Sequence, residues 1–194
     1  MKEVQLKLPQ STIIYYEDFY SREKADALYA ALKEKITWKH EQVKVFGKLY
    51  WQPRLTSFYA DNSNTYTYSS LKLTPLPFFE ELLSVKNDIQ NKVDSKFTSC
   101  LANLYRDGKD SNGWHADDEK ELGKNPEIAS LSLGQNRYFK FRHKNNPQLK
   151  EKILLKHGSL LLMKGETQHF WQHQVPKTQM KIDERINLTF RTLL

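Results

Sequence analysis

Two segments of the chain repeat their apolar residues at the spacing of an α-helix. The first runs from Ser21, a residue type that caps helix N-termini, to about Ile36. The second follows a proline-rich break at residues 74–77. The repeating apolar positions are Leu28, Ala31, Leu32 and Ile36 in the first segment and Phe79, Leu82, Leu83, Ile89 and Val93 in the second. Both patterns predict helices that pack one face against a core.

Short runs of β-branched and aromatic residues, separated by turn residues, make up most of the remaining chain. Between residues 38 and 70 the pattern predicts two or three strands, with breaks at Gly47 and Pro53. Further strands are predicted near residues 13–15, 101–105, 128–133, 138–142, 153–155, 160–163 and 185–191. Many short strands beside two supporting helices predict an α+β protein whose core is a β-sandwich or jelly roll.

The composition limits the class of protein. At 194 residues the chain suits one domain and can bury a core without disulfides or metal as staples. The single cysteine, Cys100, cannot form an intramolecular disulfide and excludes a cysteine-based zinc cluster. No apolar run has the length of a secretory signal or a membrane span. We therefore expect a soluble intracellular protein with no membrane partner.

The charge favours an anionic partner. The formal net charge is +7, and nucleic acid is a common partner of basic intracellular domains, although excess lysine also serves plain solubility. The first basic group comprises Lys39, His40, Lys44 and Lys48, and the second comprises Arg137, Lys140, Arg142, His143 and Lys144, followed by Lys150, Lys152 and Lys156. Two separated groups could hold the two strands of a duplex.

A histidine and a carboxylate stand two positions apart at His115 and Asp117. In an extended chain these two side chains point to the same side. A second histidine would complete the two-His, one-carboxylate set that binds non-haem Fe(II) and leaves coordination positions open. Both His169 and His173 are candidates, because on one strand they would face the same way. Alone, the pair is also typical of a surface strand or turn.

The stretch from Arg185 to Arg191 alternates between an apolar and a polar face. The apolar face carries Ile186, Leu188 and Phe190, and the polar face carries Arg185, Asn187, Thr189 and Arg191. An edge strand with its polar face in water is one interpretation. The other is a pocket for a small dianion, because a guanidinium can hold a carboxylate with two parallel hydrogen bonds.

Together these motifs resemble the AlkB-type Fe(II)/2-oxoglutarate dioxygenases, which repair alkylated nucleic acid. The resemblance covers the chain from about Ser11 onward, and within the family it is to the branch of the second human AlkB homologue, which acts on double-stranded DNA. Besides the ligand and arginine motifs, it is carried by residues 103–108, 115–119, 128–130, 141–144 and 157–161.

The resemblance implies a double-stranded β-helix, or jelly-roll, core over residues 97–194. Support helices and a nucleotide-recognition lid would occupy residues 1–96 of the same single domain, 1–194. The implied cofactors are Fe(II), 2-oxoglutarate and O2. The implied reaction is oxidative demethylation of bases such as 1-methyladenine and 3-methylcytosine after base flipping, with release of formaldehyde, succinate and CO2.

The resemblance also assigns roles to individual residues. The family's third iron ligand lies three residues before a Val/Leu-Pro pair, which selects His173 over His169. The residues implied to hold 2-oxoglutarate are Asn103, Tyr105, Arg185, Asn187, Thr189 and Arg191. The residues implied to contact substrate are Phe46, Gly47, Lys48, Arg54, Tyr66, Thr67, Tyr68, Ser69, Asp118 and Glu119.

Several of these substrate residues have a plainer interpretation. Phe46 could be a core residue at a hairpin tip, whereas the family uses the matching aromatic as a finger inserted into the base stack. Tyr66 and Tyr68 could pack within a strand, whereas the family uses them as walls of the flipped-base pocket. Asp118 and Glu119 could be solvated loop carboxylates. Ala116 departs from the related branch, which has arginine there.

Three other functions remain open at this point. The same chemistry could act on RNA or single-stranded DNA, or a related oxygenase could act on protein or lipid. A binding module that has lost its metal is the third possibility. A zinc hydrolase can also use two histidines and a carboxylate, but it would not need the two arginines. We expect a monomer that binds alkylated DNA, in the cytoplasm of a bacterium or the nucleus of a eukaryote.

Overall fold

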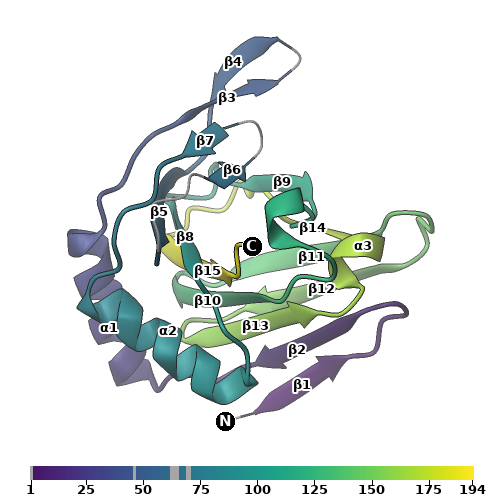
Figure 1. The fold of residues 1–194 in the computed structure, drawn as a ribbon, viewed down its shortest axis with the longest axis horizontal. Coiled ribbons are helices and arrows are strands. Elements are labelled where there is room, and N and C mark those ends of the chain that lie inside the picture. Colours follow the sequence, from purple (N-terminus) through teal and green to yellow (C-terminus); the bar gives the residue numbers. More distant parts are fainter. Residues whose placement is uncertain (1, 46, 62–65, 69–70) are drawn as a thin grey trace.

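In the computed structural model, residues 2–45, 47–61, 66–68 and 71–194 are described. The largest element is a seven-stranded sheet with the order β1-β2-β13-β10-β15-β8-β5, whose neighbours pair antiparallel (Figure 1). Its strands are β1 (Glu3–Leu6), β2 (Thr12–Tyr16), β13 (Ser159–Lys164), β10 (Ile128–Gly134), β15 (Arg185–Arg191), β8 (Ser99–Tyr105) and β5 (Leu55–Ala60).

A second sheet of four strands has the order β12-β11-β14-β9. Its strands are β12 (Lys150–Leu155), β11 (Arg137–His143), β14 (Trp171–Val175) and β9 (Asn112–His115). From β8 to β15 the chain passes between the two sheets at each step except the β11–β12 hairpin, which stays in the small sheet. This alternation between two facing antiparallel sheets confirms the predicted jelly-roll core.

Two helices cover the outer face of the large sheet, away from the small one (Figure 1). Helix α1 (Arg22–Lys35) begins at Ser21, whose hydroxyl accepts a hydrogen bond from the Lys24 amide, and helix α2 (Glu80–Val93) follows Phe79. Both predicted helices are confirmed within a residue or two. Within the described part of the chain, no helix is long and apolar enough to cross a membrane.

The hydrophobic core has two layers, one on each face of the large sheet. Ile186, Leu188 and Phe190 of β15 pack toward the helices in the first layer. The second layer fills the space between the sheets and includes Phe141 and Trp171 of the small sheet. The residues of β15 alternate between apolar and polar because the strand lies in the centre of the large sheet. Its apolar side packs toward the helices, and its polar side faces the interior between the two sheets.

Two hairpins lie outside the sheets. One pairs β3 (Gln42–Val45) with β4 (Lys48–Trp51) and projects from the body, and the other pairs β6 (Tyr66–Tyr68) with β7 (Leu71–Leu73) nearby (Figure 1). Gly47 adopts φ +81° at the first hairpin's turn, a conformation that favours glycine. The prediction of two or three strands for residues 38–70 was too low, since β3, β4, β5 and β6 all lie there.

Several short elements were not predicted from the sequence. Strand β1 extends the edge of the large sheet by pairing with β2. The single-turn helix α3 (Thr167–Phe170) interrupts the chain between β13 and β14. A 3₁₀ turn, η1 (Lys120–Leu122), follows the His115 and Asp117 region. Of these, α3 has the largest effect on the candidate site, because it separates His169 from β14.

Candidate metal and 2-oxoglutarate site

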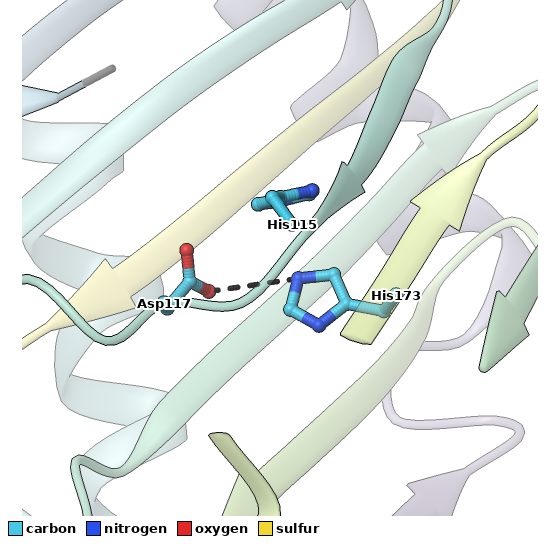
Figure 2. A group of neighbouring side chains, drawn as sticks. All are labelled: His115, Asp117 and His173. Carbon is cyan, nitrogen blue, oxygen red and sulfur yellow. Dashed lines mark ion pairs between the residues drawn. The ribbon is translucent and has the colours of Figure 1, made fainter. Parts of the chain in front are cut away.

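His115, Asp117 and His173 lie together between the two sheets (Figure 2). One ligand atom from each residue lies within 4.8 Å of the other two. The imidazole rings of His115 and His173 are 4.3 Å apart between centroids, and His173 Nε2 lies 3.8 Å from Asp117 Oδ2. The geometry therefore permits all three side chains to bind one metal ion.

The two histidines are brought together by strand pairing. His115 on β9 and His173 on β14 are direct partners across the antiparallel ladder, a position that places side chains on the same face of a sheet. His169 does not share this face, because it belongs to α3 and not to β14, and its side chain is exposed. The assumption of one continuous strand was wrong, and the structure separates the two candidates that periodicity left open.

The carboxylate of Asp117 is held by a buried cation. Arg191 on β15 donates from Nη2 to Asp117 Oδ1 at 2.8 Å, and both side chains are almost fully buried. Burial would raise the pKa of Asp117, but the charge and hydrogen bond of Arg191, together with His173 and His115, outweigh it and the pKa falls to about 2. Asp117 is therefore an anion at neutral pH, the form that binds a metal.

Both histidines are neutral at neutral pH. Burial, and then the proximity of His115, lowers the pKa of His173 to about 3, and burial also lowers the pKa of His115. His115 Nδ1 lies 2.7 Å from the Gly113 carbonyl, which makes Nδ1 the protonated nitrogen. Its Nε2 then carries the lone pair, as metal-binding histidines commonly arrange, and in this structure Asn112 Nδ2 lies 3.1 Å from it.

Arg185 offers hydrogen-bond donors to the same pocket. Its side chain is 1% exposed, and Nη2 donates to the Ser132 hydroxyl at 2.9 Å. Nε and Nη1 are buried and have no hydrogen-bond partner among the described residues. Burial lowers the pKa of Arg185 to about 10, so the group stays charged at neutral pH. An unsatisfied buried guanidinium is costly, and a carboxylate ligand would satisfy it.

A polar network joins the strands along the pocket. Asn103 donates to Asn187 Oδ1 at 3.4 Å, and Thr189 donates to the same oxygen at 3.0 Å. Asn187 in turn donates to the Ser130 hydroxyl at 2.8 Å. All six residues predicted to hold 2-oxoglutarate line the pocket that also contains the three candidate metal ligands: Asn103, Tyr105, Arg185, Asn187, Thr189 and Arg191.

Arg54 lies behind this pocket, where it contacts the lining residue Asn103. Its side chain donates from Nε to Asn103 Oδ1 at 2.7 Å and from Nη1 to the Ser111 carbonyl at 3.3 Å. Only 4% of Arg54 is exposed. The structure therefore gives this residue a partner at the predicted 2-oxoglutarate position, although the sequence analysis assigned it to nucleic acid.

The other predicted substrate residues that the structure describes lie on the two hairpins and in the loop after β9. Gly47 and Lys48 are exposed on the β3–β4 hairpin, Asp118 is exposed, and Glu119 is half-buried. Tyr66, Thr67 and Tyr68 form β6, beside β7. Phe46 and Ser69 lie outside the described residues. The substrate roles of all these residues stay predictions.

The second basic group is divided by strand alternation. Arg137 and His143 are buried, and Arg137 donates to the backbone carbonyls of Asp107, Asp110 and Pro176. Lys140 and Arg142 point to the outer face of the small sheet, where the Arg142 guanidinium stacks on the Trp114 ring at 4.4 Å. Treating residues 137–144 as one cationic surface was therefore wrong.

Several residues that shape the pocket were not predicted from the sequence. Ser130 and Ser132 on β10 bond the side chains of Asn187 and Arg185, and Phe139 stacks on His173 with ring centroids 5.1 Å apart. The alternation Ser130-Leu131-Ser132 was a visible signal for the serines. Gln168 on α3, which accepts a hydrogen bond from the Asp117 amide, gave no sequence signal at all.

These residues fit a divalent metal with a small dicarboxylate. Two neutral imidazoles and one carboxylate form a ligand set with open positions, suited to non-haem Fe(II). Arg185 lies in the same pocket with two donors to spare. The arrangement can bind a metal at one point and a carboxylate at another, which suits a cosubstrate that reaches both.

Comparison with known proteins gives the same family. Residues 12–191 match the 2OG-Fe(II) oxygenase superfamily. The chain is 42% identical over 184 residues to bovine alpha-ketoglutarate-dependent dioxygenase alkB homolog 3, covering 90% of this chain and 64% of that protein. It is 41% identical over 192 residues to the human protein of that name, covering 94% of this chain and 66% of the relative. It thus spans about two thirds of these relatives.

Identity to a second group of relatives is lower. The human DNA oxidative demethylase ALKBH2 is 35% identical over 189 residues, covering 92% of this chain and 72% of the relative. The preference for the second-homologue branch is therefore not supported by identity. The solved structure titled "The structure of OsALKBH1" has a TM-score of 0.68 at 15% identity, covering 98% of this chain and all of that one, which shows a shared fold. By these matches, the chain belongs to the 2OG-Fe(II) oxygenase superfamily, among the AlkB homologues.

Proposed function

We propose that this chain is an Fe(II)- and 2-oxoglutarate-dependent dioxygenase that oxidatively demethylates alkylated nucleic-acid bases. The observation that carries the proposal is one pocket that contains both a His-Asp-His set and a buried arginine with unused donors. The names of its relatives add support, since they include a DNA oxidative demethylase. The described residues of a single chain bring the three candidate ligands and Arg185 into this pocket, and we propose that the protein acts as a monomer.

Each part of the pocket has a task in this proposal. His115, Asp117 and His173 would hold Fe(II), which together with 2-oxoglutarate and O2 would supply the oxidation of the methyl group. Arg185 would bind a carboxylate of 2-oxoglutarate beside Tyr105, whose ring centroid lies 5.2 Å from the guanidinium carbon. Arg191 keeps Asp117 ionised. The hydroxymethyl product on the base nitrogen then breaks down to formaldehyde and the repaired base.

The finer proposal concerns the substrate. We infer that it is 1-methyladenine or 3-methylcytosine in duplex DNA, flipped out of the helix because the methyl groups lie on the pairing edge. The projecting β3–β4 hairpin supports this inference, with Leu49, Tyr50 and Trp51 exposed and Lys48 at its start. An apolar projection can enter a base stack at the cost of a few kcal/mol of unstacking.

The test is mass spectrometry of an oligonucleotide that carries one 3-methylcytosine. Purified protein, Fe(II), ascorbate and 2-oxoglutarate are incubated with the duplex, the single strand and an RNA of the same sequence. Loss of one methyl mass is expected, fastest on the duplex. His173→Ala should abolish the loss, whereas His169→Ala, which changes an exposed side chain of α3 four positions away, should retain it.

Other outcomes would change the proposal in defined ways. Faster loss on single-stranded DNA or RNA would reject the duplex preference and keep the chemistry. No loss on any substrate by protein that binds both metal and 2-oxoglutarate would reject nucleic-acid demethylation. Equal loss by wild type and His173→Ala would reject the assignment of the third ligand.

A further inference from the structure

Asp117 lies two residues beyond the end of β9, the strand that carries the candidate ligand His115. The ladder between β9 and β14 runs from the Asn112–Val175 pair to the His115–His173 pair, where β9 ends. His115 and His173 are thus positioned by backbone hydrogen bonds between strands. Asp117, two residues further on, has no such ladder and needs another support to hold its position.

Gln168 supplies a support from α3. Its side chain is 1% exposed, and Oε1 accepts a hydrogen bond from the Asp117 backbone N–H at 3.0 Å. Its Nε2 lies 3.6 Å from the Met163 sulfur, a weak acceptor. The opposite orientation of the amide would place two donors face to face at Asp117, so the contact fixes which atom is oxygen. Gln168 therefore occupies the place that a neighbouring strand's carbonyl would take.

Lys144 links the same two segments a second time. Its Nζ donates to the Gln168 backbone carbonyl at 3.0 Å and to Asp118 Oδ2 at 2.9 Å. The two residues after Ala116 are thus attached to Gln168 at two points, one through a backbone amide and one through a side chain. The amide contact is fully buried, whereas Asp118 is exposed and its ion pair with Lys144 is weaker in water.

We propose that Gln168 is a positioning residue for the metal ligand Asp117. Its amide oxygen fixes the backbone from which the Asp117 carboxylate projects, while Arg191 holds the carboxylate itself. This inference rests on the proposed metal site and adds to it a residue that touches no metal, cosubstrate or substrate. Outer contacts of this kind commonly change metal affinity by about 10- to 100-fold when they are removed.

The test is a titration of the metal-free protein with Mn(II), which needs no turnover and no nucleic acid. Gln168→Leu removes the acceptor at similar volume, and Gln168→Glu keeps a carbonyl-type oxygen in the same place. Gln172→Leu is the matched control, because Gln172 is on the neighbouring strand and accepts from Arg142 on the outer face of the sheet. The visible absorption of the Co(II) complex reports the geometry of the ligands in each variant.

We expect Gln168→Leu to bind Mn(II) about 10-fold or more weakly, with an altered Co(II) spectrum. Gln168→Glu should recover at least part of the affinity, and Gln172→Leu should match wild type in both measurements. Urea unfolding of the metal-free proteins, and titration well below the unfolding temperature, separate this loss from simple instability.

Two results would overturn the inference on different grounds. Wild-type affinity and an unchanged Co(II) spectrum in Gln168→Leu would reject the role of Gln168 while leaving the metal site intact. An equal loss in Gln168→Leu and Gln172→Leu would show a general effect of losing a glutamine and would also reject it. No Mn(II) binding by wild type would reject the metal site and this inference together.

Discussion

The Arg191 guanidinium and the Asp117 carboxylate form a buried ion pair, with Nη2 and Oδ1 2.8 Å apart. The pair joins β15 to the loop after β9, two parts of the chain that share no strand pairing. A candidate metal ligand is thus fixed by a residue near the end of the jelly roll. The same contact therefore helps to keep Asp117 ionised and links β15 to the loop after β9.

The first prediction concerns this pair. Arg191→Met should lower the free energy of unfolding of the metal-free protein by about 3–5 kcal/mol, because it leaves a buried carboxylate without its cation. Adding Asp117→Asn to Arg191→Met should cost less than the sum of the two single changes, since both remove the same interaction. Urea unfolding of the four proteins measures this coupling. Additive losses would show that the pair contributes no interaction of its own.

Metal binding should stabilise the folded protein. At a Mn(II) concentration 100 times its dissociation constant, linkage predicts about 2.7 kcal/mol. For a chain of this size that corresponds to a rise in melting temperature of about 5–11 °C. His173→Ala should lose the shift, and His169→Ala should keep it. Differential scanning calorimetry measures it, and an equal shift in His173→Ala would place the ion elsewhere.

Arg185 should control affinity for 2-oxoglutarate. Arg185→Lys keeps the charge but loses the planar pair of donors at Nε and Nη1, so we expect weaker binding by about 10-fold, the cost of one charged hydrogen bond. Calorimetric titration of the Mn(II)-loaded protein with 2-oxoglutarate measures the change. Arg142→Lys, on the outer face of the small sheet, is the matched control. Unchanged affinity in Arg185→Lys would place the dicarboxylate away from this side chain.

Arg54 gives a prediction that separates two roles for one residue. Because Arg54 is buried against Asn103, Arg54→Met should weaken 2-oxoglutarate binding and lower stability by about 1–3 kcal/mol. Its effect on binding of an unmodified duplex should be smaller than that of Lys48→Ser on the exposed hairpin. Calorimetry and fluorescence anisotropy give the two affinities. The reverse order would return Arg54 to a nucleic-acid contact.

Asp110 should make stability depend on acid pH. Burial would raise the pKa of Asp110, but hydrogen bonds from the Arg106 side chain and amide outweigh it and lower the pKa below the unfolded value. The stabilisation is therefore present above about pH 4 and is lost as pH falls through the folded pKa.

The measurement compares wild type with Asp110→Asn by urea unfolding across pH. At pH 7 wild type should be more stable by about 1–3 kcal/mol, and the difference should shrink toward pH 3. The exposed Asp183→Asn should change stability by less than about 0.5 kcal/mol throughout. A difference that does not vary with pH would show that the charge of Asp110 contributes nothing.

Periodicity predicted the elements whose two faces meet different surroundings. The apolar residues of each helix, such as Leu32 in α1 and Ile89 in α2, recur at helical spacing because each helix buries one side on the large sheet. The alternation from Arg185 to Arg191 was visible because one face meets that helix-side core and the other the pocket. Where both faces of a ribbon are exposed, as around Leu49 and Trp51, no such contrast exists, and the number of strands was underestimated.

The site was predictable as a set of residue types but not as a set of contacts. His115, Asp117 and Arg185 could be recognised because metal and carboxylate binding demand particular side chains at particular spacings. The burial of Arg54 and the link between Gln168 and Asp117 join positions 49 and 51 residues apart in sequence. Such contacts depend on how the sheets face each other, which no local pattern records.

The place of β15 has a consequence for the order in which the protein can be built. It is the last strand along this chain, yet it lies inside the large sheet between β10 and β8. While the ribosome is still making it, those two strands have open edges, and open edges invite pairing with other chains. Arg185 and Arg191 arrive on the same late strand. The nascent protein thus lacks both of these arginines, and with them the polar wall of the pocket, for as long as its sheet is incomplete.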